Sequence, residues 1–428
     1  MRLLAKEETP SDWISKKIGF YVLGHKGGAA LRPNDFSNTG FPVIPKKAIQ
    51  PTGELLIENP TYCTNEFASN NKRSIVDSSY AITTLRDLVP TGPTIGTVVN
   101  FSNEEKYILS QGVYGLKLND ALDKHYLSYL SNTAFYRKVM QRIMVGSTQV
   151  HIRTPEYLDL EIQIPPLPEQ QKIAKILSTW DKAISNTERL IENSTQQKKA
   201  LMQQLLTGKK RLLDNEGKRF EGEWSDNHLH EVAKIIVSPV NKKTVEGEIP
   251  VELCNYTDVY YNIRITNSLE FMKATAKQSE IDRYTLQVGD VIITKDSETP
   301  GDIAIPALVS EDLGGVVCGY HLAIIRPNKK LLEGAFLNYL LSMPETRYYF
   351  FTLANGATRF GLSIGSINNA HFSLPPLKEQ QKIATVLTNT DKEIDLLEQQ
   401  LADLQQEKKA LMQVLLTGKR RVLVDGES

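Results

Sequence analysis

Apolar side chains recur at alternating steps of four and three residues along two segments of the chain, one spanning about 169–206 and the other starting near Ile383. This is the heptad spacing of a coiled-coil helix. A Pro-Pro pair precedes each segment and blocks helix upstream, while Gly208 and Gly418 can take the left-handed conformation that ends a helix. We therefore expect two long helices. The positions expected to pair them are Ile173, Leu177, Trp180, Ile184, Ile191, Leu201, Leu205, Ile383, Leu387, Ile394, Leu397, Leu401, Leu404, Leu411 and Leu415. Polar residues fill the remaining seam positions, at Thr187, Ser194, Lys198, Thr390 and Lys408.

The two helical segments are copies of each other. Residues 165–211 and 375–421 align without a gap at an offset of 210, with 27 identities in 47 positions. The offset persists upstream, where the turn at 146–148 matches the one at 356–358. An internal duplication of a domain plus a helix explains this pattern. It favours pairing of the two helices within one chain, antiparallel if a pseudo-twofold axis relates the halves, over a generic coiled-coil homodimer.

The segments outside the helices contain short β-like runs between Gly, Pro and Asn turns, each followed by a helical stretch, near 123–142 and near 333–351. This mixture predicts an α+β protein, with two similar mixed α/β domains separated by the two long helices of an antiparallel intrachain coiled coil. The expected strands are 41–44, 80–83, 96–99, 249–253, 290–294, 301–305 and 321–325. The expected parts are a first domain at 1–164, a central helix at 165–211, a second domain at 212–374 and a C-terminal helix at 375–428.

Composition excludes several classes of protein. The chain has 428 residues and 41% apolar residues, enough to build packed cores. Its cysteines, Cys63, Cys254 and Cys318, are odd in number and far apart, which argues against a disulfide scaffold and a metal site and fits the cytoplasm. No window resembles a signal peptide or a membrane span.

Charge is balanced overall but not locally. The chain carries 50 basic and 50 acidic residues. Residues 1–164 carry 18 basic and 16 acidic side chains, and 165–211 carry 9 and 4; residues 212–374 carry 15 and 21, and 375–428 carry 8 and 9. The acidic second domain is a difficulty for a DNA-binding protein, because phosphate contacts dominate affinity. A local basic face or a basic partner would resolve it.

Catalytic motifs are short or incomplete. Asn59–Tyr62 reads Asn-Pro-Thr-Tyr and resembles the Asn-Pro-Pro-Tyr loop of adenine-N6 methyltransferases, but its third position differs and no glycine-rich cofactor turn is near. An Asn-Pro turn is the better interpretation. His228 and His230 lack an acidic or cysteine partner in the sequence, so a surface pair is favoured over a metal site. We expect no catalytic residue, no metal and no cofactor.

The repeated block resembles the conserved regions of type I restriction–modification specificity subunits. It reads Pro-Pro-Leu-x-Glu-Gln-Gln-Lys-Ile-Ala at 165–174 and Lys-Lys-Ala-Leu-Met-Gln-x-Leu-Leu-Thr-Gly-Lys at 198–209, and recurs at the 210-residue offset. Phe-Glu-Gly-Glu-Trp at 220–224 looks like the usual start of the second target-recognition domain, and Asp12-Trp13 is a shorter form of it.

The resemblance implies a non-catalytic DNA sequence-recognition subunit in the cytoplasm. Its two target-recognition domains would each read one half of a bipartite site in double-stranded DNA. Its helices would dock two modification (methyltransferase) subunits, which carry S-adenosylmethionine and can supply phosphate contacts. Restriction subunits, the ATP-dependent translocase and nuclease, would complete the assembly. Two alternatives remain: a coiled-coil scaffold without DNA binding, which leaves two diverged domains unexplained, and a lone methyltransferase, which lacks a cofactor fold.

Basic and polar loop residues are the expected DNA contacts. Lys and Arg would mostly meet phosphates, whereas an Arg or Gln can read a base edge through two hydrogen bonds. Arg359 is the strongest candidate, because it follows a Gly-Ala-Thr turn that repeats Gly-Ser-Thr of the first domain. The candidates are Lys46, Lys47, Lys72, Arg73, Ser147, Gln149, Lys242, Lys243, Lys295, Ser297, Arg359 and Ser363.

Overall fold

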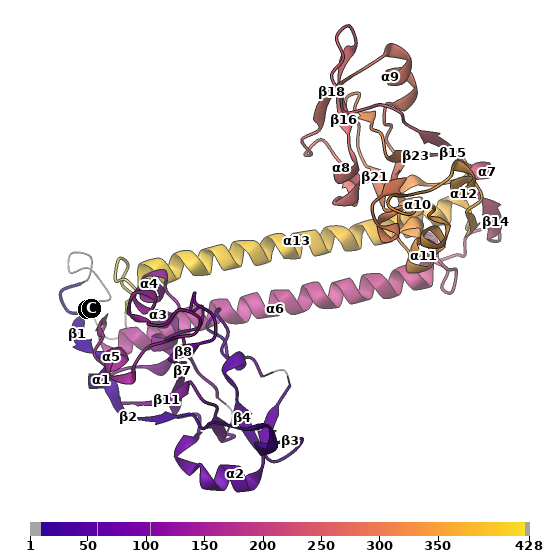
Figure 1. Ribbon diagram of the computed structural model, residues 1–428. Coiled ribbons are helices and arrows are strands. Elements are labelled where there is room, and N and C mark those ends of the chain that lie inside the picture. Colours follow the sequence, from indigo (N-terminus) through magenta and orange to yellow (C-terminus); the bar gives the residue numbers. More distant parts are fainter. Residues whose placement is uncertain (1–9, 58, 103, 424–428) are drawn as a thin grey trace. The chain divides into compact units, whose positions relative to one another are not determined.

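The computed structural model describes residues 10–57, 59–102 and 104–423. Its contacts divide the chain into two compact units. Unit 1 comprises residues up to Glu188 together with those from Gln399 onward, and unit 2 comprises Arg189–Glu398. Each unit therefore contains one globular domain and a segment of both long helices (Figure 1). The contacts thus cut each helix in two, whereas the division expected from the sequence kept each helix as a separate part.

The long helices are α6, Leu167–Leu205, and α13, Leu377–Leu415, and each has 39 residues. This confirms the two helices expected from the heptad pattern. Every position expected to pair them is buried or half-buried, as are the polar seam positions. Leu190 and Leu396, which lie off the seam, are 51% and 71% exposed.

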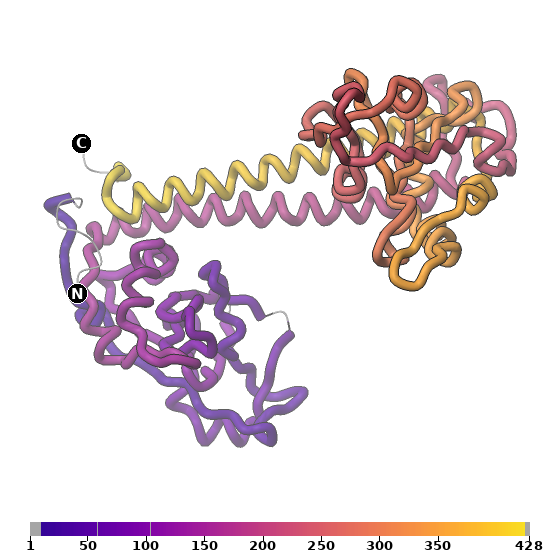
Figure 2. The backbone as a smooth tube through the Cα atoms, turned by 45° about the horizontal axis from the view of Figure 1, so that its top comes forward, coloured from indigo at the N-terminus to yellow at the C-terminus, as the bar shows by residue number. Residues whose placement is uncertain are grey.

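Within each unit the two helices run antiparallel. In unit 1, the start of α6 at Ile173 shares a core with the end of α13 at Leu415. In unit 2, the end of α6 at Leu205 shares a core with the start of α13 at Ile383. The helices lie side by side in both views (Figures 1 and 2). The expected antiparallel intrachain pairing is therefore confirmed.

The domain of unit 1 is built on two larger sheets and two short strand pairs. One sheet has the strand order β2-β11-β7-β9 and the other β3-β5-β4-β10-β6, while β1 pairs with β13 and β8 with β12. The strands are β1 Ile14–Lys17, β2 Val22–Gly27, β3 Phe36–Ser37, β4 Phe41–Ile44, β5 Thr61–Cys63, β6 Ile75–Val76, β7 Tyr80–Thr84, β8 Arg86–Asp87, β9 Val98–Val99, β10 Tyr107–Leu109, β11 Val113–Leu118, β12 Val150–His151 and β13 Glu161–Ile164. The helices are α1 Ile18–Tyr21, α2 Asn65–Asn70, α3 Lys124–Ser131, α4 Ala134–Ile143 and α5 Thr154–Leu158, with 3-10 turns η1 Pro33–Asp35, η2 Lys46–Ala48 and η3 Lys72–Ser74.

The domain of unit 2 repeats this plan. Its sheets have the strand orders β15-β23-β19-β21-β17 and β18-β16-β22, while β14 pairs with β25 and β20 with β24. The strands are β14 Ser225–His228, β15 Ala233–Val237, β16 Ile249–Cys254, β17 Arg264–Ile265, β18 Met272–Ala276, β19 Val291–Thr294, β20 Asp296–Ser297, β21 Pro306–Val309, β22 Val317–Cys318, β23 Leu322–Pro327, β24 Phe360–Gly361 and β25 His371–Leu374. The helices are α7 Leu229–Val232, α8 Tyr256–Tyr260, α9 Gln278–Tyr284, α10 Gly334–Leu341, α11 Pro344–Leu353 and α12 Ile364–Asn368, with the 3-10 turn η4 Pro300–Asp302.

Strand register shows that the two domains have the same fold. Val113 pairs with Thr84 in unit 1, as Leu322 pairs with Thr294 in unit 2. The β8–β12 and β20–β24 pairs match residue for residue at the offset of 210. The chain is therefore an α+β protein of two similar domains, as expected.

The expected strand at 301–305 is wrong. Pro300 and Gly301 lie in the 3-10 turn η4, and Ala304 takes a left-handed conformation with φ 57°. A proline without an N–H and a left-handed residue both prevent a continuous strand. The helical stretches near 123–142 and 333–351 each form two helices rather than one.

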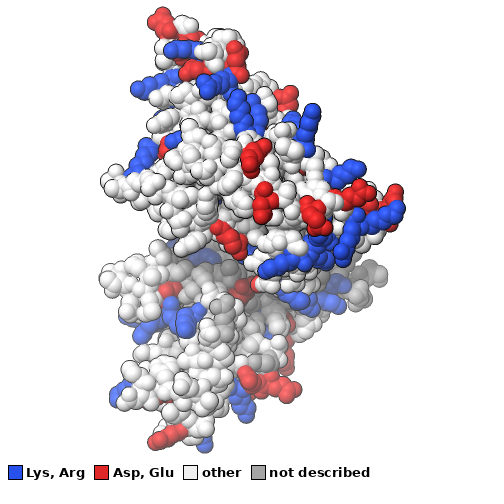
Figure 3. Space-filling view, turned by 90° about the vertical axis from the view of Figure 1, so that its right-hand side faces the viewer, with Lys and Arg blue, Asp and Glu red and all other residues white. Residues whose placement is uncertain are grey.

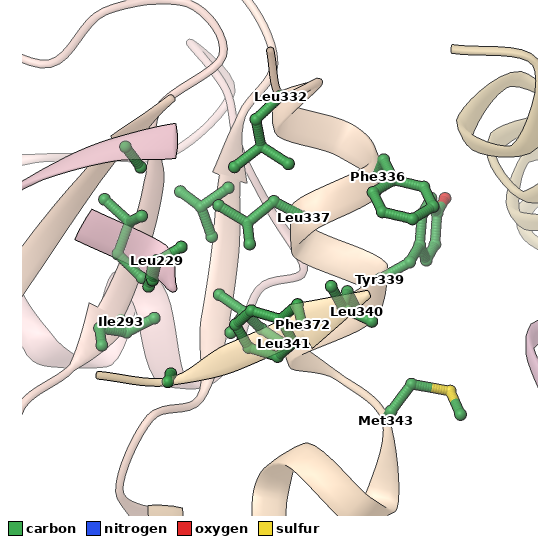
Figure 4. Packing of buried hydrophobic residues seen from close by; sticks show 14 of the residues in the cluster. Leu229, Ile293, Leu332, Phe336, Leu337, Tyr339, Leu340, Leu341, Met343 and Phe372 are labelled. Carbon is green, nitrogen blue, oxygen red and sulfur yellow. The ribbon is translucent and has the colours of Figure 1, made fainter. Parts of the chain in front are cut away.

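The ends of the long helices are part of each domain's core. In unit 2, Leu337 of α10 points toward the side of Ile293 of β19, whereas Phe336 lies on the other side of α10; both belong to one buried cluster with Phe372 of β25 (Figure 4). Leu387 of α13 belongs to the same buried cluster. Burying a side chain of this size contributes about 1.5–3 kcal/mol, so the domain is anchored firmly on its helix ends.

Candidate nucleic-acid interface

Most of the expected DNA contacts in unit 1 are exposed on loops. Lys47 follows β4, Lys72 and Arg73 lie in η3, and Ser147 and Gln149 lie in the hairpin loop that the Val145–His151 bridge closes.

A hollow in unit 1 is lined by basic and amide side chains. Lys26, Asn71, Arg73 and Gln111 contribute to it, and Gln111 belongs to the turn between β10 and β11. The hollow thus brings one expected contact, Arg73, beside a turn that the sequence did not single out.

Lys46 differs from its neighbour, because its side chain is only 20% exposed and its Nζ lies 2.9 Å from Asp87 Oδ1. The buried Asp87 carboxylate also accepts hydrogen bonds from the hydroxyl of Thr94 and from two backbone amides. Burial alone would raise the pKa of Asp87, but the hydrogen bonds from Lys46 and Thr94 outweigh it and lower that pKa. Lys46 therefore holds a buried carboxylate rather than facing solvent.

The DNA contacts expected in unit 2 also fall into an exposed group and an enclosed group. Lys242 and Lys243 are exposed in the loop before β16, and Arg359 and Ser363 are exposed around β24. Ser363 also caps α12 by accepting a hydrogen bond from the backbone N–H of Ser366.

Two expected contacts in unit 2 are enclosed instead. The Lys295 side chain is 18% exposed and its Nζ lies 2.8 Å from Asp296 Oδ1. Ser297 is buried, and its hydroxyl lies 3.1 Å from that of Tyr256. The Lys295 side chain is therefore held against Asp296, and the Ser297 hydroxyl against Tyr256.

Three side chains from three elements meet at one corner of unit 2. Asp296 begins β20, His321 ends the turn between β22 and β23, and Arg359 lies in the loop before β24. His321 Nδ1 is 3.0 Å from Asp296 Oδ2, and Arg359 Nη2 is 2.9 Å from each ring nitrogen of His321. Burial would raise the pKa of Asp296, but hydrogen bonds from Lys295 and His321 lower it overall. The carboxylate is thus ionised and can orient the imidazole.

The corresponding corner of unit 1 has different chemistry. Strand register makes three pairs of positions equivalent between the two domains. Arg86 corresponds to Asp296, Gly112 to His321 and Gln149 to Arg359. Arg86 and Gln149 are exposed. The two domains therefore present different hydrogen-bonding groups from the same backbone frame.

Asp296, His321 and Arg86 were not among the contacts expected from the sequence. Carrying the 210-residue offset back from the hairpin to β8 would have paired Arg86 with Asp296. His321 corresponds to Gly112 at an offset of 209, so a fixed offset misses it.

Tyr320 contacts His321 at the corner of unit 2, and Tyr256 contacts Ser297, the neighbour of Asp296. Tyr256 stacks on Tyr260, with ring centroids 5.5 Å apart, and Tyr260 contacts Tyr261 edge-on. Tyr261 is 77% exposed and Tyr320, beside His321, is 50% exposed. Exposed rings of this kind favour a binding surface.

On the face seen in Figure 3, basic side chains lie in several places, some of them side by side, and acidic side chains are interspersed among them. This agrees with the zero net charge of the chain. Binding of a polyanion by this face would therefore rest on a few local contacts.

Both helix starts carry the same clamp on their own domain. Gln170 and Gln380 are buried; each accepts a hydrogen bond from a backbone N–H of its domain and donates to a domain carbonyl and to a proline carbonyl before the helix. Next to them, the buried Glu169 pairs with Arg421, and Glu379 pairs with Arg211. These bonds explain why Glu-Gln is identical in the two copies.

A second repeated cluster lies along the helices. In unit 1, Asp181 accepts a hydrogen bond from the Tyr129 hydroxyl and pairs with Lys408. In unit 2, Asp391 does the same with Tyr339 and with Lys198, at 2.5 Å. The lysines in the apolar seam therefore have carboxylate partners.

Asp391 has an additional partner, since Arg264 Nη2 lies 3.2 Å from its Oδ2. Burial and the bond to Asp391 raise the pKa of Tyr339 to about 12, so its hydroxyl stays protonated. The cluster in unit 2 therefore ties β17 as well as α10 to the helices.

No group of three His, Cys, Asp or Glu that could hold a metal occurs in residues 10–57, 59–102 and 104–423. In the same described ranges, no helix is long and apolar enough to cross a membrane.

A family model for the type I restriction modification DNA specificity domain matches residues 10–194 and 221–406. The chain is 27% identical over 348 residues to a putative type I restriction enzyme MjaX specificity subunit of Methanocaldococcus jannaschii, covering 77% of this chain and 76% of that protein. It is 22% identical over 380 residues to the StySPI specificity subunit of Salmonella potsdam, covering 87% and 76%.

Solved structures share the fold. The type I restriction–modification S subunit of M. genitalium matches with a TM-score of 0.55 and 14% identity, covering 96% of this chain and 98% of that one. The HsdS subunit of Thermoanaerobacter tengcongensis matches with a TM-score of 0.50 and 19% identity, covering 96% and 98%. Because the family match spans most of its length, this chain belongs to the type I restriction–modification specificity subunits and is a specificity component rather than an enzyme.

Proposed function

We propose that the chain reads a bipartite site in double-stranded DNA, with one domain for each half-site, and that its helices dock two modification subunits in an assembly completed by restriction subunits. The observation that carries the proposal is the contrast between clamps and corners. The Glu-Gln clamps are the same in both units, whereas the corners at Arg86 and Asp296 differ. A protein that reads two different half-sites needs domains that attach to the helices in the same way but expose different hydrogen-bonding groups.

Phosphate contacts would come from the exposed loop cations. Lys47, Lys72 and Arg73 serve unit 1, and Lys242 and Lys243 serve unit 2. So few cations predict weak salt dependence for the chain alone, because the slope of log K against log salt follows the number of phosphates neutralised. Adding the modification subunits should steepen that slope.

Docking of modification subunits would use the outward faces of the helices, where Leu190 and Leu396 are exposed. Exposed apolar side chains on a helix favour a protein partner. Replacing Leu396 with Glu should abolish co-purification with the modification subunit while leaving the melting temperature unchanged. Leu213→Glu, an exposed position outside the helices, is the control that should co-purify normally.

Selection from a randomised duplex pool tests DNA reading by the assembled complex. The proposal predicts two enriched blocks at a fixed separation. A coiled-coil scaffold without DNA binding predicts no enriched sequence.

A further inference from the structure

Two non-glycine residues among those that the structure describes have a positive φ, and both belong to unit 2. They are Ala304, with φ 57°, and His321, with φ 76°. Their counterparts in unit 1 are glycines in the same conformation, Gly96 with φ 73° and Gly112 with φ 89°. The two domains thus share the backbone shape but not the side chain.

A side chain in this conformation is strained, at a cost that the surroundings have to offset. Ala304 is fully buried, so packing of its methyl group accounts for it. His321 is only half-buried at the surface, and core packing does not account for it. Its ring is instead held by polar contacts with Asp296 and Arg359.

The contact with Asp296 determines which group donates the hydrogen bond at Nδ1 of His321. Asp296 is ionised and can only accept, so His321 donates its Nδ1 proton to it. Arg359 Nη2 lies 2.9 Å from Nδ1 and 2.9 Å from Nε2, so the guanidinium group rests against the face of the imidazole. This contact holds the exposed Arg359 fork in place. An Arg fork held in place is the group that pairs with O6 and N7 of guanine.

Unit 1 offers no such chain of contacts, because Gly112 has no side chain and Gln149 replaces Arg359. The same corner therefore presents the amide of Gln149 and the guanidinium of Arg86 in unit 1, and a guanidinium positioned by His321 in unit 2. A difference of this kind, placed on one shared frame, is expected where two domains must distinguish different bases.

We propose that this corner is a base-reading point in each domain, that Arg359 reads a guanine in the half-site of unit 2, and that His321 is a positioning residue that holds Arg359 for this contact. The proposal rests on the proposed DNA-reading function and assigns it to named residues. It also explains why a strained histidine stands where the other domain has glycine.

The test uses the full chain assembled with its modification subunits and the duplex that the wild type selects. Binding is titrated at fixed salt against that duplex and against every single-base variant of it. Arg359→Ala should weaken binding about 5- to 150-fold and remove discrimination at one guanine of one half-site. Discrimination in the other half-site should be unchanged. Lys330→Ala, which removes an exposed cation of the same domain outside the corner, should keep discrimination at every position.

His321→Gly separates positioning from folding. Glycine accepts the left-handed conformation without strain, so the melting temperature should not fall, while discrimination at the same guanine should be reduced. Unchanged discrimination in both Arg359→Ala and His321→Gly would overturn the proposal. For His321→Gly, a loss of discrimination spread over many positions, or a lower melting temperature, would overturn the positioning role. If the wild type selects no duplex at all, the DNA-reading function fails instead, so the two failures are distinguishable.

Discussion

Lys46 and Lys47 are adjacent, yet the structure gives them different surroundings. Lys46 Nζ pairs with the buried Asp87, whereas Lys47 is exposed. Lys46→Ala should lower the free energy of unfolding by about 1–3 kcal/mol, because it removes a charged hydrogen-bond partner from a buried group. Lys47→Ala should leave stability unchanged and weaken DNA binding. Urea denaturation and a binding titration on both variants check this, and equal stability losses would contradict it.

Asp87 also predicts a pH dependence. Its pKa in the folded protein lies below the ordinary value of 3.8, so it contributes stability above that value and loses it as the pH falls through the folded pKa. In Lys46→Ala the hydrogen bond from Lys46 is lost, whereas burial, which raises the pKa of Asp87, and the hydrogen bonds from Thr94 remain. Acid unfolding of this variant should therefore begin at a higher pH than in the wild type. Urea midpoints measured from pH 7 to pH 3 would show it, and superimposable acid profiles would rule it out.

At the scale of elements, the two carboxylates on the long helices form a matched pair. Asp391 is 9% exposed and holds Lys198, Arg264 and Tyr339, whereas Asp181 is 40% exposed. Asp391→Asn should lower the free energy of unfolding by about 3–5 kcal/mol, because it leaves enclosed cations without their counterion. Asp181→Asn should cost about 1 kcal/mol or less, as for solvated pairs. Denaturation of the two variants decides this, and equal costs would show that burial of the cluster is irrelevant.

The long helices could be predicted because the heptad period, the Pro-Pro starts and the glycine ends all agree over 39 residues. Strands such as β4 and β19 could also be predicted, since their apolar runs are flanked by turn residues. The prediction of a strand at 301–305 was wrong, because nothing in the sequence indicates that Ala304 takes the left-handed conformation. The corner at His321 was missed because it depends on strand register, and the segment from Thr294 to His321 is one residue shorter than its counterpart from Thr84 to Gly112.

At the scale of the whole molecule, continuous helices shared by both units would set the gap between half-sites. Deleting residues 182–188 and 401–407 removes seven residues from each helix and keeps the heptad seam in phase. At 1.5 Å per residue this removes about 10 Å, or about three base pairs at 3.4 Å each. The recognised half-sites should stay the same and the gap should shorten. Deletions of two or five residues break the seam and should abolish activity, whereas an unchanged gap with activity retained would show that the helices do not set the spacing.

The most direct test of the account is sequencing of methylated sites in cells that carry the complete system, with the natural chain and with residues 212–374 exchanged for those of a relative. If each domain reads its own half-site, the exchanged chain will methylate sites in which one half-site has changed and the other half-site and the gap are the same. If both half-sites change together, or neither does, the two domains do not read DNA independently and the account is wrong.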